Sequence, residues 1–340
     1  MRKLKFFCII FCISFFISCA PSPVSSKTET ALNTVCTIQL FEYGTEKMYK
    51  KLFERLDEIE RQLSVTIPSS EISHINKAAG DFPVKVTAGT FNLIDSSLGF
   101  AKESSGAFNP VMGSLVSLWN ITAFDSIKDS LPSPVQVEEA RKKTDYLKVK
   151  LDAEKQSVYL TDKGMILDLG GIAKGWAADE LISLISGAGI PYAIINLGGN
   201  IYAYGEKANG EQWNIGIKNP FDSNASPVIS IKTDSTSIVT SGVYERFFVK
   251  DGVMYHHILD MNTGYPVQNG LVSVTIVHSS SMTADALSTM VFALGKKKGL
   301  EYLNSNNIKG ILITEDHEVY ASEGIKNAVS MLDDDFICMR

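Results

Sequence analysis

Two oxygen-bearing side chains stand four residues apart in the segment TADALST (residues 283–289), which has a helical pattern. Asp285 and Thr289 occupy positions i and i+4, so both side chains lie on one face of the expected helix. A carboxylate beside a hydroxyl suits a hard cation such as Mg²⁺, which keeps further coordination positions for water and phosphate. The alternative is a helix cap formed by this region, and taken alone the segment fits a cap better.

Two pairs of glycines follow apolar segments. Gly170 and Gly171 stand between an expected strand and an expected helix, and Gly198 and Gly199 follow another strand. Neither G-x-G-x-x-G nor a Walker A loop is present, but glycine backbone at the start of a helix can approach a phosphate closely. Lys174 would add a positive charge there. The alternatives are a tight turn with a surface lysine at the first pair and a simple turn at the second.

His256 and His257 are consecutive in an expected strand over 255–259. Neighbouring side chains of a strand point to opposite faces, so only one of the two can face a given pocket. This argues against a metal site made by the pair and leaves one histidine as a candidate general base or phosphate contact. The alternative is one packed and one solvated histidine. The segment TSGVYER (240–246) is not G-x-S-x-G, so it does not indicate a nucleophile elbow.

A chain of 340 residues, 45% apolar and 21% charged, can bury the large core needed to position such groups. Because the expected strands run in series with helices interspersed irregularly, we predict an α+β fold with mixed or antiparallel sheets and packed helices. Helices are expected at 46–63, 91–104, 135–144, 281–294 and 297–305. Strands are expected at 31–41, 147–151, 157–160, 165–169, 193–197, 213–217, 228–232, 237–240, 245–249, 255–259, 272–278, 310–314 and 318–321. Residues 260–266 (DMNTGYP) are predicted to form a turn.

The N-terminal segment predicts export. Residues 1–18 combine a basic start with an apolar run that is too short to span a bilayer, which is typical of a signal peptide. Cys19 follows directly between Ser18 and Ala20, as in a bacterial lipoprotein cleavage site. We therefore expect a chain anchored to a bacterial membrane through lipidated Cys19 and facing the periplasm, with 19–30 as a tether and 31–340 as one catalytic domain. A secretory signal followed by a free cysteine is the alternative.

Charge and cysteine content exclude other classes of protein. The formal net charge is −6 and no basic stripe is visible, which argues against a nucleic-acid partner. Five cysteines in a chain of this length do not make a disulfide scaffold. Beyond Cys19 only Cys36 and Cys338 remain, and the sequence leaves open whether they pair.

Taken together, these segments resemble the ApbE family of FAD:protein FMN transferases. The motifs that carry the resemblance fall in family order and are DLGGIAKGWAAD (168–179), INLGGNIYAYG (195–205), TSGVYERFF (240–248), HHILDMNTGYPV (256–267) and TADALSTMVFALG (283–295). Weaker matches are ALNTVCTIQL (31–40), SSEISHIN (69–76) and GAFNPVMGSLVSLW (106–119). The resemblance implies a single unit that binds FAD and Mg²⁺ and moves FMN from FAD to a Ser or Thr hydroxyl of an acceptor flavoprotein, releasing AMP. It also implies subunits of membrane redox pumps as acceptors.

The resemblance assigns roles to individual residues. Asp285, Thr289 and the backbone carbonyl of Gly171 match the family's metal ligands, and His257 matches the expected base. The positions that match FAD contacts are Ala107, Phe108, Asn109, Asp168, Lys174 and His257. The family usually has Asp where Asn109 stands, and often Met-Gly where Leu32-Asn33 stand.

Two other functions are compatible with the same residues. An FAD pyrophosphatase would use this site with water as the nucleophile and produce FMN and AMP, and the sequence barely separates it from a transferase. A flavin-binding lipoprotein without enzymatic activity would bind its ligand reversibly, without a metal and without forming AMP. The pairing of Asp285 with Thr289 argues against this second alternative.

Overall fold

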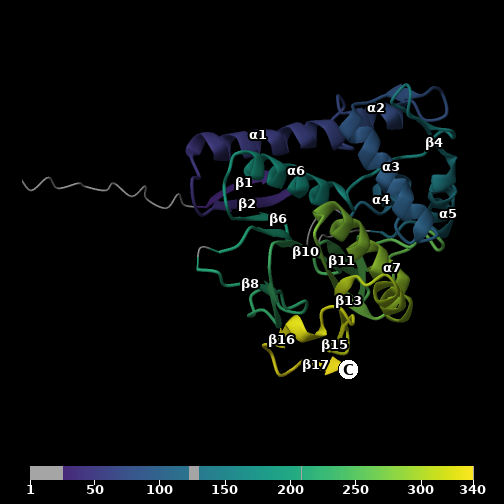
Figure 1. The fold of residues 1–340 in the computed structure, drawn as a ribbon. Coiled ribbons are helices and arrows are strands. Elements are labelled where there is room, and N and C mark those ends of the chain that lie inside the picture. Colours follow the sequence, from purple (N-terminus) through teal and green to yellow (C-terminus); the bar gives the residue numbers. More distant parts are fainter. Residues whose placement is uncertain (1–25, 122–129, 208, 340) are drawn as a thin grey trace, which may run out of the picture.

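A nine-stranded sheet forms the centre of the protein (Figure 1). The computed structural model describes residues 26–121, 130–207 and 209–339, and there the strand order is β1-β2-β6-β7-β10-β13-β14-β15-β17. Neighbouring strands are antiparallel, except that β15 and β17 are parallel. The strands are β1 (Lys27–Ala31), β2 (Thr34–Leu40), β6 (Ala193–Leu197), β7 (Asn200–Tyr204), β10 (Thr236–Gly242), β13 (Leu271–His278), β14 (Lys309–Thr314), β15 (Glu318–Ala321) and β17 (Ile337–Met339).

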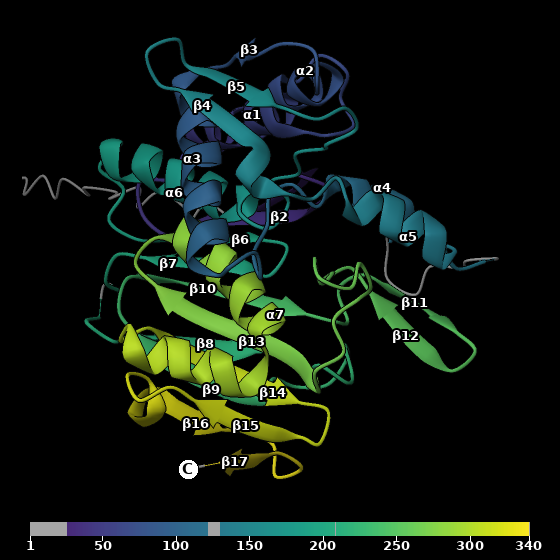
Figure 2. The ribbon, with the colours of Figure 1, turned by 90° about the vertical axis from the view of Figure 1, so that its right-hand side faces the viewer.

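Helices α6 and α7 pack on each other and against this sheet, and α1 packs on α6 (Figures 1 and 2). Helix α1 buries a continuous apolar stripe that includes Leu52, Leu56 and Ile59, as its amphipathic pattern predicted. The α-helices of the described chain are α1 (Glu46–Leu63), α2 (Glu71–Lys77), α3 (Ala88–Glu103), α4 (Gly113–Trp119), α5 (Pro134–Arg141), α6 (Ala173–Gly187) and α7 (Ser281–Ser305). Mixed sheets with packed helices confirm the predicted α+β class.

Three smaller sheets and two 3₁₀ helices complete the described fold. The hairpin β11–β12 stands apart from the central sheet, close to α4 and α5 (Figure 2). A small apolar cluster joins it to these helices, because Phe248 packs with Leu115, Trp119 and Val137. The elements are β3 (Val84–Lys85) with β4 (Val149–Asp152) and β5 (Ser157–Leu160); β8 (Trp213–Ile217) with β9 (Ile229–Thr233) and β16 (Val329–Met331); β11 (Phe247–Lys250) with β12 (Val253–His256); and η1 (Tyr146–Lys148) and η2 (Lys326–Ala328).

The N-terminus of α7 is capped by residues other than Asp285 and Thr289, the two candidate metal ligands. Ser280 accepts a hydrogen bond from the Thr283 amide, and the carboxylate of Asp179 in α6 accepts from the amides of Ser281 and Met282. These acceptors satisfy the exposed N–H groups of the first turn. Asp285 therefore does not cap α7, its own helix, and its carboxylate bonds instead to an amide in the first turn of α6. The two helices predicted at 281–294 and 297–305 are confirmed as the two helical segments of α7, which meet at Gly295, where the backbone is non-helical with φ of +80°.

The strand predicted at 165–169 does not form. The Asn76 side chain accepts from the Leu167 amide at 2.7 Å and donates to the Leu167 carbonyl at 2.9 Å. The backbone on either side of Leu167 bonds to the Pro110 carbonyl and the Gly113 amide. The strand predicted at 255–259 ends at His256, and the strand predicted at 245–249 begins at Phe247. Near the N-terminus β1 pairs with β2 from Lys27 onward, so paired structure begins before the domain boundary expected at residue 31.

The predicted signal peptide, Cys19 and the first part of the tether lie outside the described residues. Cys36 is buried in β2 and Cys338 is exposed in β17, and the two are free thiols. In the part of the chain that the structure describes, no helix has the length and apolar character required to cross a membrane.

Candidate active site

Helix α7 holds Asp285 against the first turn of α6. Asp285 is 3% exposed, and its Oδ2 accepts a hydrogen bond from the Gly175 amide at 2.9 Å. Its Oδ1 lies 3.7 Å from Nζ of Lys174. The two helices approach so closely that a Cβ at position 175 would lie 2.2 Å from the Ser281 carbonyl oxygen, which only glycine permits. One carboxylate is thus fixed at the start of α6, beside a lysine.

A directed chain of hydroxyls sets the orientation of Thr289. Ser288 Oγ donates to the Asp285 carbonyl at 2.8 Å, so its one proton is committed. Ser241 Oγ, 2.7 Å from Ser288 Oγ, must then donate to it. The 3.2 Å contact between Ser241 and Thr289 leaves Thr289 Oγ1 as the donor. The Thr289 oxygen therefore keeps its lone pairs for another partner.

The junction before α6 approaches Thr289 at Gly171. A Cβ placed on Gly171 would lie 3.7 Å from Thr289 Oγ1 and 3.2 Å from the Phe108 ring. Asp168, three residues earlier, accepts from the Gly170 amide at 2.8 Å. Burial raises the pKa of Asp168, and the Gly170 bond and the charges of Arg246 and Lys174 oppose that rise.

The loop that contains Ala107, Phe108 and Asn109 is bonded to this junction, because the Asp168 amide donates to the Pro110 carbonyl at 2.8 Å. Phe108 is buried and Ala107 is half-buried. The Asn109 amide is used inside the protein: it donates to the Thr144 carbonyl at 2.8 Å and accepts from the Val111 amide at 2.8 Å. Its side chain therefore holds the loop in place.

The two consecutive histidines differ in their hydrogen bonds and in their surroundings. His256 is 2% exposed; its Nε2 donates to the Val267 carbonyl at 2.7 Å and its Nδ1 accepts from the Ile258 amide at 3.3 Å. His257 donates through Nδ1 to the Arg246 carbonyl at 3.2 Å, which leaves Nε2 as the unprotonated nitrogen of the neutral ring. Burial and the Arg246 charge lower the pKa of His257 to about 3. His257 is thus held as a neutral base, while His256 is a packed core residue.

Glu245 and Arg246, which directly precede β11, complete the cluster. Arg246 and Lys174 both act on Asp168 and on His257 through their charges. Burial raises the pKa of Glu245, with Lys174 and Arg246 opposing the rise and Asp285 adding to it. Positive charges therefore lie around a carboxylate and a neutral imidazole, which is an arrangement that can receive an anion such as a phosphate.

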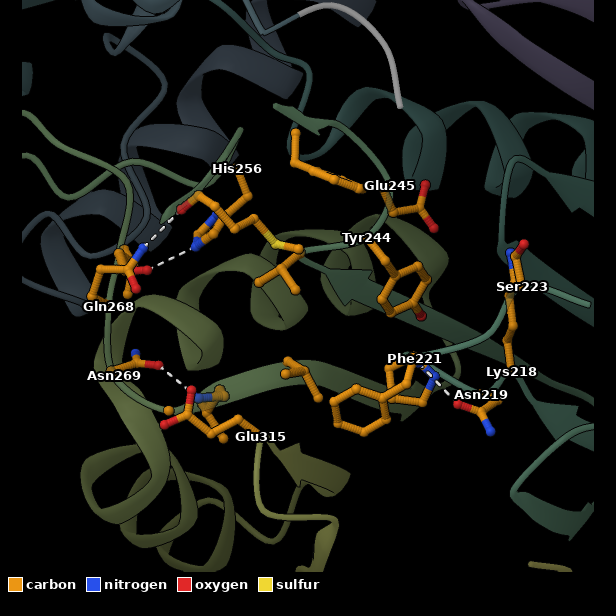
Figure 3. Close-up of a pocket in the computed structure, with 18 of the residues that line it drawn as sticks. Lys218, Asn219, Phe221, Ser223, Tyr244, Glu245, His256, Gln268, Asn269 and Glu315 are labelled. Atoms are coloured by element: carbon orange, nitrogen blue, oxygen red, sulfur yellow. Dashed lines mark hydrogen bonds between the residues drawn. The ribbon is translucent and has the colours of Figure 1, made fainter. Parts of the chain in front are cut away.

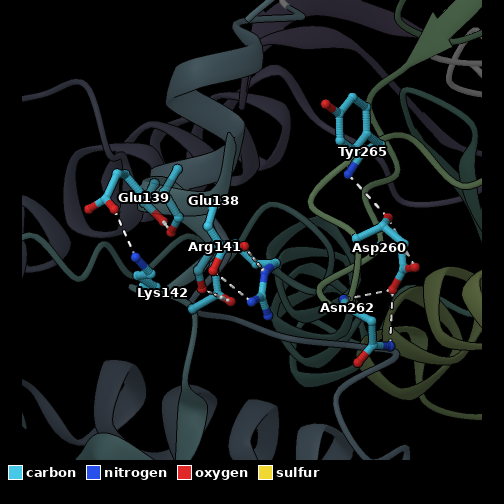
Figure 4. A network of polar contacts seen from close by, with 11 residues as sticks. Glu138, Glu139, Arg141, Lys142, Asp260, Asn262 and Tyr265 are labelled. Atoms are coloured by element: carbon cyan, nitrogen blue, oxygen red, sulfur yellow. Dashed lines mark hydrogen bonds and ion pairs between the residues drawn. The ribbon is translucent and has the colours of Figure 1, made fainter. Parts of the chain in front are cut away.

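The turn that follows His257 is fixed by Asp260 (Figure 4). The Asp260 carboxylate accepts from the Asn262 amide at 2.9 Å and from the Thr263 hydroxyl at 3.2 Å. The Gly264 carbonyl in turn accepts from Trp119 Nε1 at 2.7 Å. These bonds confirm the predicted turn and tie the histidine segment to α4.

The fit to Mg²⁺ rests on the type of donor. The described residues contain no group of three or more His, Cys, Asp and Glu side chains that could hold a metal ion. One carboxylate of Asp285, the free lone pairs of Thr289 and the neighbouring backbone of Gly171 offer hard oxygens with a single negative charge. Mg²⁺ favours such sparse sites, because it keeps several waters and binds substrate phosphates. The residues present therefore fit this metal.

A model of the ApbE family matches residues 32–312. The chain belongs to the ApbE family. It is 36% identical to the FAD:protein FMN transferase of Treponema pallidum (strain Nichols), over 93% of this chain and 91% of that protein. It is 34% identical to the FAD:protein FMN transferase of Klebsiella pneumoniae (strain 342), over 91% and 95% of the two chains.

Solved ApbE structures share the fold. The crystal structure of the ApbE protein from Thermotoga maritima superposes with a TM-score of 0.81 at 33% identity and covers 89% of this chain and 98% of its own. The flavin transferase ApbE from Vibrio cholerae gives a TM-score of 0.81 at 26% identity, with the same coverage of both chains.

Most of the residues assigned through the ApbE resemblance come together in the structure. The cluster contains Phe108, Asp168, Gly171, Lys174, His257, Asp285 and Thr289. Sequence reasoning missed Ser241, Glu245 and Arg246, although all three lie in the quoted motif TSGVYERFF. Their contribution depends on strand pairing and on side-chain direction, and the only signal available was that their motif precedes the histidine pair.

We expect this ApbE protein to lose stability in mild acid because of its two consecutive histidines, His256 and His257. Burial lowers the pKa of both His256 and His257 below the ordinary value of 6.5. Below pH 6.5 the unfolded chain therefore binds protons that the folded chain does not. We expect the unfolding free energy to be highest above pH 7 and to fall as the pH drops from 6.5 to 5.5, by at most about 1.4 kcal/mol per pH unit for each histidine.

Urea unfolding across this pH range measures the effect. His257→Gln should flatten the slope, since glutamine does not titrate. The raised pKa values of Asp168 and Glu245 act in the opposite direction, because the folded chain takes up these protons at a higher pH than the unfolded chain. Both carboxyls are present in wild type and in His257→Gln, so the difference between the two slopes reports on His257. Equal slopes for wild type and His257→Gln would contradict the assignment of His257 as a group that the folded chain keeps neutral.

Proposed function

We propose that this chain transfers FMN from FAD to a Ser or Thr hydroxyl of an acceptor flavoprotein, in an Mg²⁺-dependent reaction that releases AMP. Relatives that are 36% and 34% identical over most of the chain carry the name FAD:protein FMN transferase. The observation that carries the proposal is that Lys174, which lies 3.7 Å from the Asp285 carboxylate, also acts through its charge on His257, whose Nε2 is unprotonated. The oxygens of Asp285 and Thr289 are held in fixed orientations.

Two hollows lie beside this cluster. Asp168, assigned to FAD by the resemblance, lines a hollow of about 420 Å³ that also includes Asn76 and Gly113. Lys174, whose charge acts on Asp168, provides a positive charge close by, which suits a pyrophosphate. We infer that FAD binds from this side. Mg²⁺ held by Asp285, Thr289 and the Gly171 carbonyl would neutralise pyrophosphate charge.

The remaining chemistry belongs to residues of this chain. The acceptor hydroxyl oxygen attacks the phosphorus of the FMN half of FAD, and the bond from that phosphorus to the bridging oxygen breaks. AMP leaves with the bridging oxygen. Nε2 of His257 takes the hydroxyl proton, because the proton of the neutral ring is on Nδ1, which donates to the Arg246 carbonyl. Lys174 and Arg246 would lower the cost of bringing the nucleophile towards negative phosphates.

Incubation of the full-length chain in detergent with FAD tests the proposal. The reaction is run with and without Mg²⁺ and with and without an acceptor domain, and AMP release and acceptor mass are followed. We expect an acceptor mass increase of one FMN, with AMP, only when Mg²⁺ is present. AMP with free FMN and no modified acceptor would instead indicate a pyrophosphatase. FAD that is bound and unchanged in all conditions would indicate a flavin carrier.

Ser241 provides a further test of the metal assignment. Ser241→Ala removes the acceptor of the Thr289 proton, so the Thr289 hydroxyl is free to rotate. We expect Mg²⁺ affinity, measured by titration in the absence of FAD, to fall by about 10- to 100-fold. Thr240→Val is the matched control. It removes the neighbouring hydroxyl of β10, which bonds to Thr275 in β13. Equal Mg²⁺ affinities for the two variants would contradict the role of Ser241.

We further propose that the chain is exported and anchored through lipidated Cys19, facing the periplasm. The support is the order of basic start, apolar run and cysteine in residues 1–19. The mass of the mature N-terminal peptide tests this proposal. A mature chain that begins elsewhere, or carries an unmodified Cys19, would contradict it.

A further inference from the structure

A short segment joins the expected lipid anchor to the folded domain. Seven residues separate Cys19 from Lys27, where strand β1 begins. A polypeptide spans at most about 3.6 Å per residue, so Lys27 can lie no more than about 29 Å from a lipidated Cys19. The anchor would therefore hold the end of the domain that contains Lys27 close to the bilayer.

Lys27 lies beside the start of α1, at the same end of the molecule (Figure 1). Its Nζ is 3.1 Å from Oε1 of Glu46, the first residue of that helix. The loop 41–45 joins β2 to α1 and borders this end, because Lys27 pairs with Ile38 near the end of β2. We call Lys27, the loop 41–45, Lys47 and Lys51 the anchor-side surface.

An aromatic side chain projects from the anchor-side surface. Tyr43 is 76% exposed, and its φ of +57° is uncommon for a bulky residue. Phe41, two residues earlier, packs with Tyr192 and Trp213, whose ring centroids lie 5.4 and 5.6 Å from its own. A tyrosine has an apolar body and a polar tip, which suits the headgroup level of a membrane.

Two lysines give this surface an excess of positive charge. Lys47 and Lys51 are exposed one turn apart in α1, and neither forms an ion pair with the residues that the structure describes. Their side chains lean towards the N-terminus of the helix, and so towards this end. Acidic side chains nearby are bonded within the protein: Glu46 to Lys27, Glu54 to Lys50, and Glu42 to the Tyr192 hydroxyl.

The charge of the whole chain gives this local excess its importance. Removal of the signal peptide takes away Arg2, Lys3 and Lys5 and changes the formal net charge from −6 to −9. A negatively charged domain held next to an anionic bilayer is repelled as a whole and turns a positively charged face towards it. The anchor-side surface is such a face, at the end that the anchor holds.

We propose that the anchor-side surface rests on anionic phospholipid headgroups, and that the catalytic cluster therefore faces away from the bilayer. The inference rests on the proposed lipid anchor. Helix α6 runs from the cluster towards this surface: Lys174 is in its first turn, and beyond its end the Tyr192 carbonyl accepts from the Phe41 amide at 3.4 Å. The 15 residues of α6 correspond to a length of about 22 Å.

Two hollows of the described chain stay clear of this contact. The smaller is the one that Asp168 lines, and the larger is a cavity of about 800 Å³ whose lining includes Tyr244, Glu245 and Glu315 (Figure 3). No residue of the anchor-side surface lines either hollow. A domain seated on the membrane in this way leaves both hollows to molecules that approach from the aqueous side.

Hydrogen exchange of the processed, lipidated chain tests the inference. The chain is placed in vesicles of phosphatidylglycerol and phosphatidylethanolamine or in vesicles of phosphatidylcholine alone, since both kinds hold the anchor and only the first is anionic. We expect the amides of residues 41–51 to exchange about threefold or more slowly on the anionic vesicles. Peptides that contain Phe82, which is 60% exposed, should exchange equally on both.

A charge-reversing double variant, Lys47→Glu/Lys51→Glu, should remove the difference between the two kinds of vesicle. The matched control, Lys297→Glu/Lys298→Glu, makes the same charge change on exposed lysines of α7 and should keep it. All chains should transfer FMN equally in detergent, where no bilayer is present.

Equal exchange of residues 41–51 on the two kinds of vesicle would overturn the inference, as would slower exchange at Phe82 instead. Loss of the difference in the control variant would also overturn it. A chain that does not float with the vesicles would contradict the lipid anchor and the inference with it. Absence of transfer in detergent, with the exchange difference present, would contradict the proposed reaction alone.

Discussion

We expect Asp285→Asn to reduce FMN transfer by about 10³-fold or more and to abolish measurable Mg²⁺ binding. The variant removes the one carboxylate of the proposed metal site, while an amide oxygen can still accept the hydrogen bond from Gly175. A Lewis acid contributes several kcal/mol of transition-state stabilisation, and each 1.4 kcal/mol corresponds to about a tenfold change in rate. Transfer is measured as acceptor mass, and Mg²⁺ binding by titration.

Two further variants separate loss of charge from loss of structure. Asp285→Ala leaves the buried Gly175 amide without a partner, so it should also cost about 1–3 kcal/mol of unfolding free energy. Asp179→Asn is the matched control, since Asp179 is another carboxylate that joins α6 to α7 but bonds only to the start of α7. Wild-type turnover by Asp285→Asn in excess Mg²⁺ would contradict the metal assignment.

His257→Ala should slow transfer by about 10²- to 10⁴-fold, the usual contribution of a general base. The ring has Nδ1 committed to the Arg246 carbonyl and Nε2 unprotonated, so its removal takes away a proton acceptor. FAD affinity, measured by quenching of flavin fluorescence, should change little, because the assigned pyrophosphate contacts are elsewhere. The rate should be recovered partly by added imidazole.

His256→Ala is the matched comparison, because it changes the adjacent ring of the same strand. Both nitrogens of His256 bond inside the protein, and its ring packs edge-on against Phe292 at 5.7 Å. We expect a lower unfolding temperature and near-normal transfer per folded molecule. The reverse pattern, with slow transfer in His256→Ala and none of this effect in His257→Ala, would show that the opposite face of β12 meets the substrate.

The sequence predicted those parts of the site that depend on local periodicity. Helical spacing placed Asp285 and Thr289 on one face, and strand alternation predicted that the two histidines would separate. Ser241 could not be found in this way, because its contacts with Ser288 and Thr289 cross from a strand to a helix nearly fifty residues later. The register of strands β10 and β13 and the packing of α7 decide that contact.

Some parts of the fold were likewise beyond prediction from local sequence patterns. Residues 165–169 are apolar enough for a strand, but Leu167 bonds to the side chain of Asn76, and its neighbours bond to the loop backbone at Pro110 and to Gly113. No pattern within the segment reveals a partner ninety residues earlier. The large cavity was also beyond prediction, since its walls come from loops whose positions follow from the surrounding sheets.

The contact of Gly175 with Asp285 has a consequence for motion in the protein. Because α6 and α7 touch through backbone at this point, and the amide of one helix is bonded to the carboxylate of the other, the two helices can separate only if the core opens with them. The Gly175 amide proton should therefore be among the slowest to exchange with deuterium in the whole chain. We therefore expect any local opening that admits FAD to occur in the loops around these helices. The oxygens of α7 would then keep a constant distance from the start of α6.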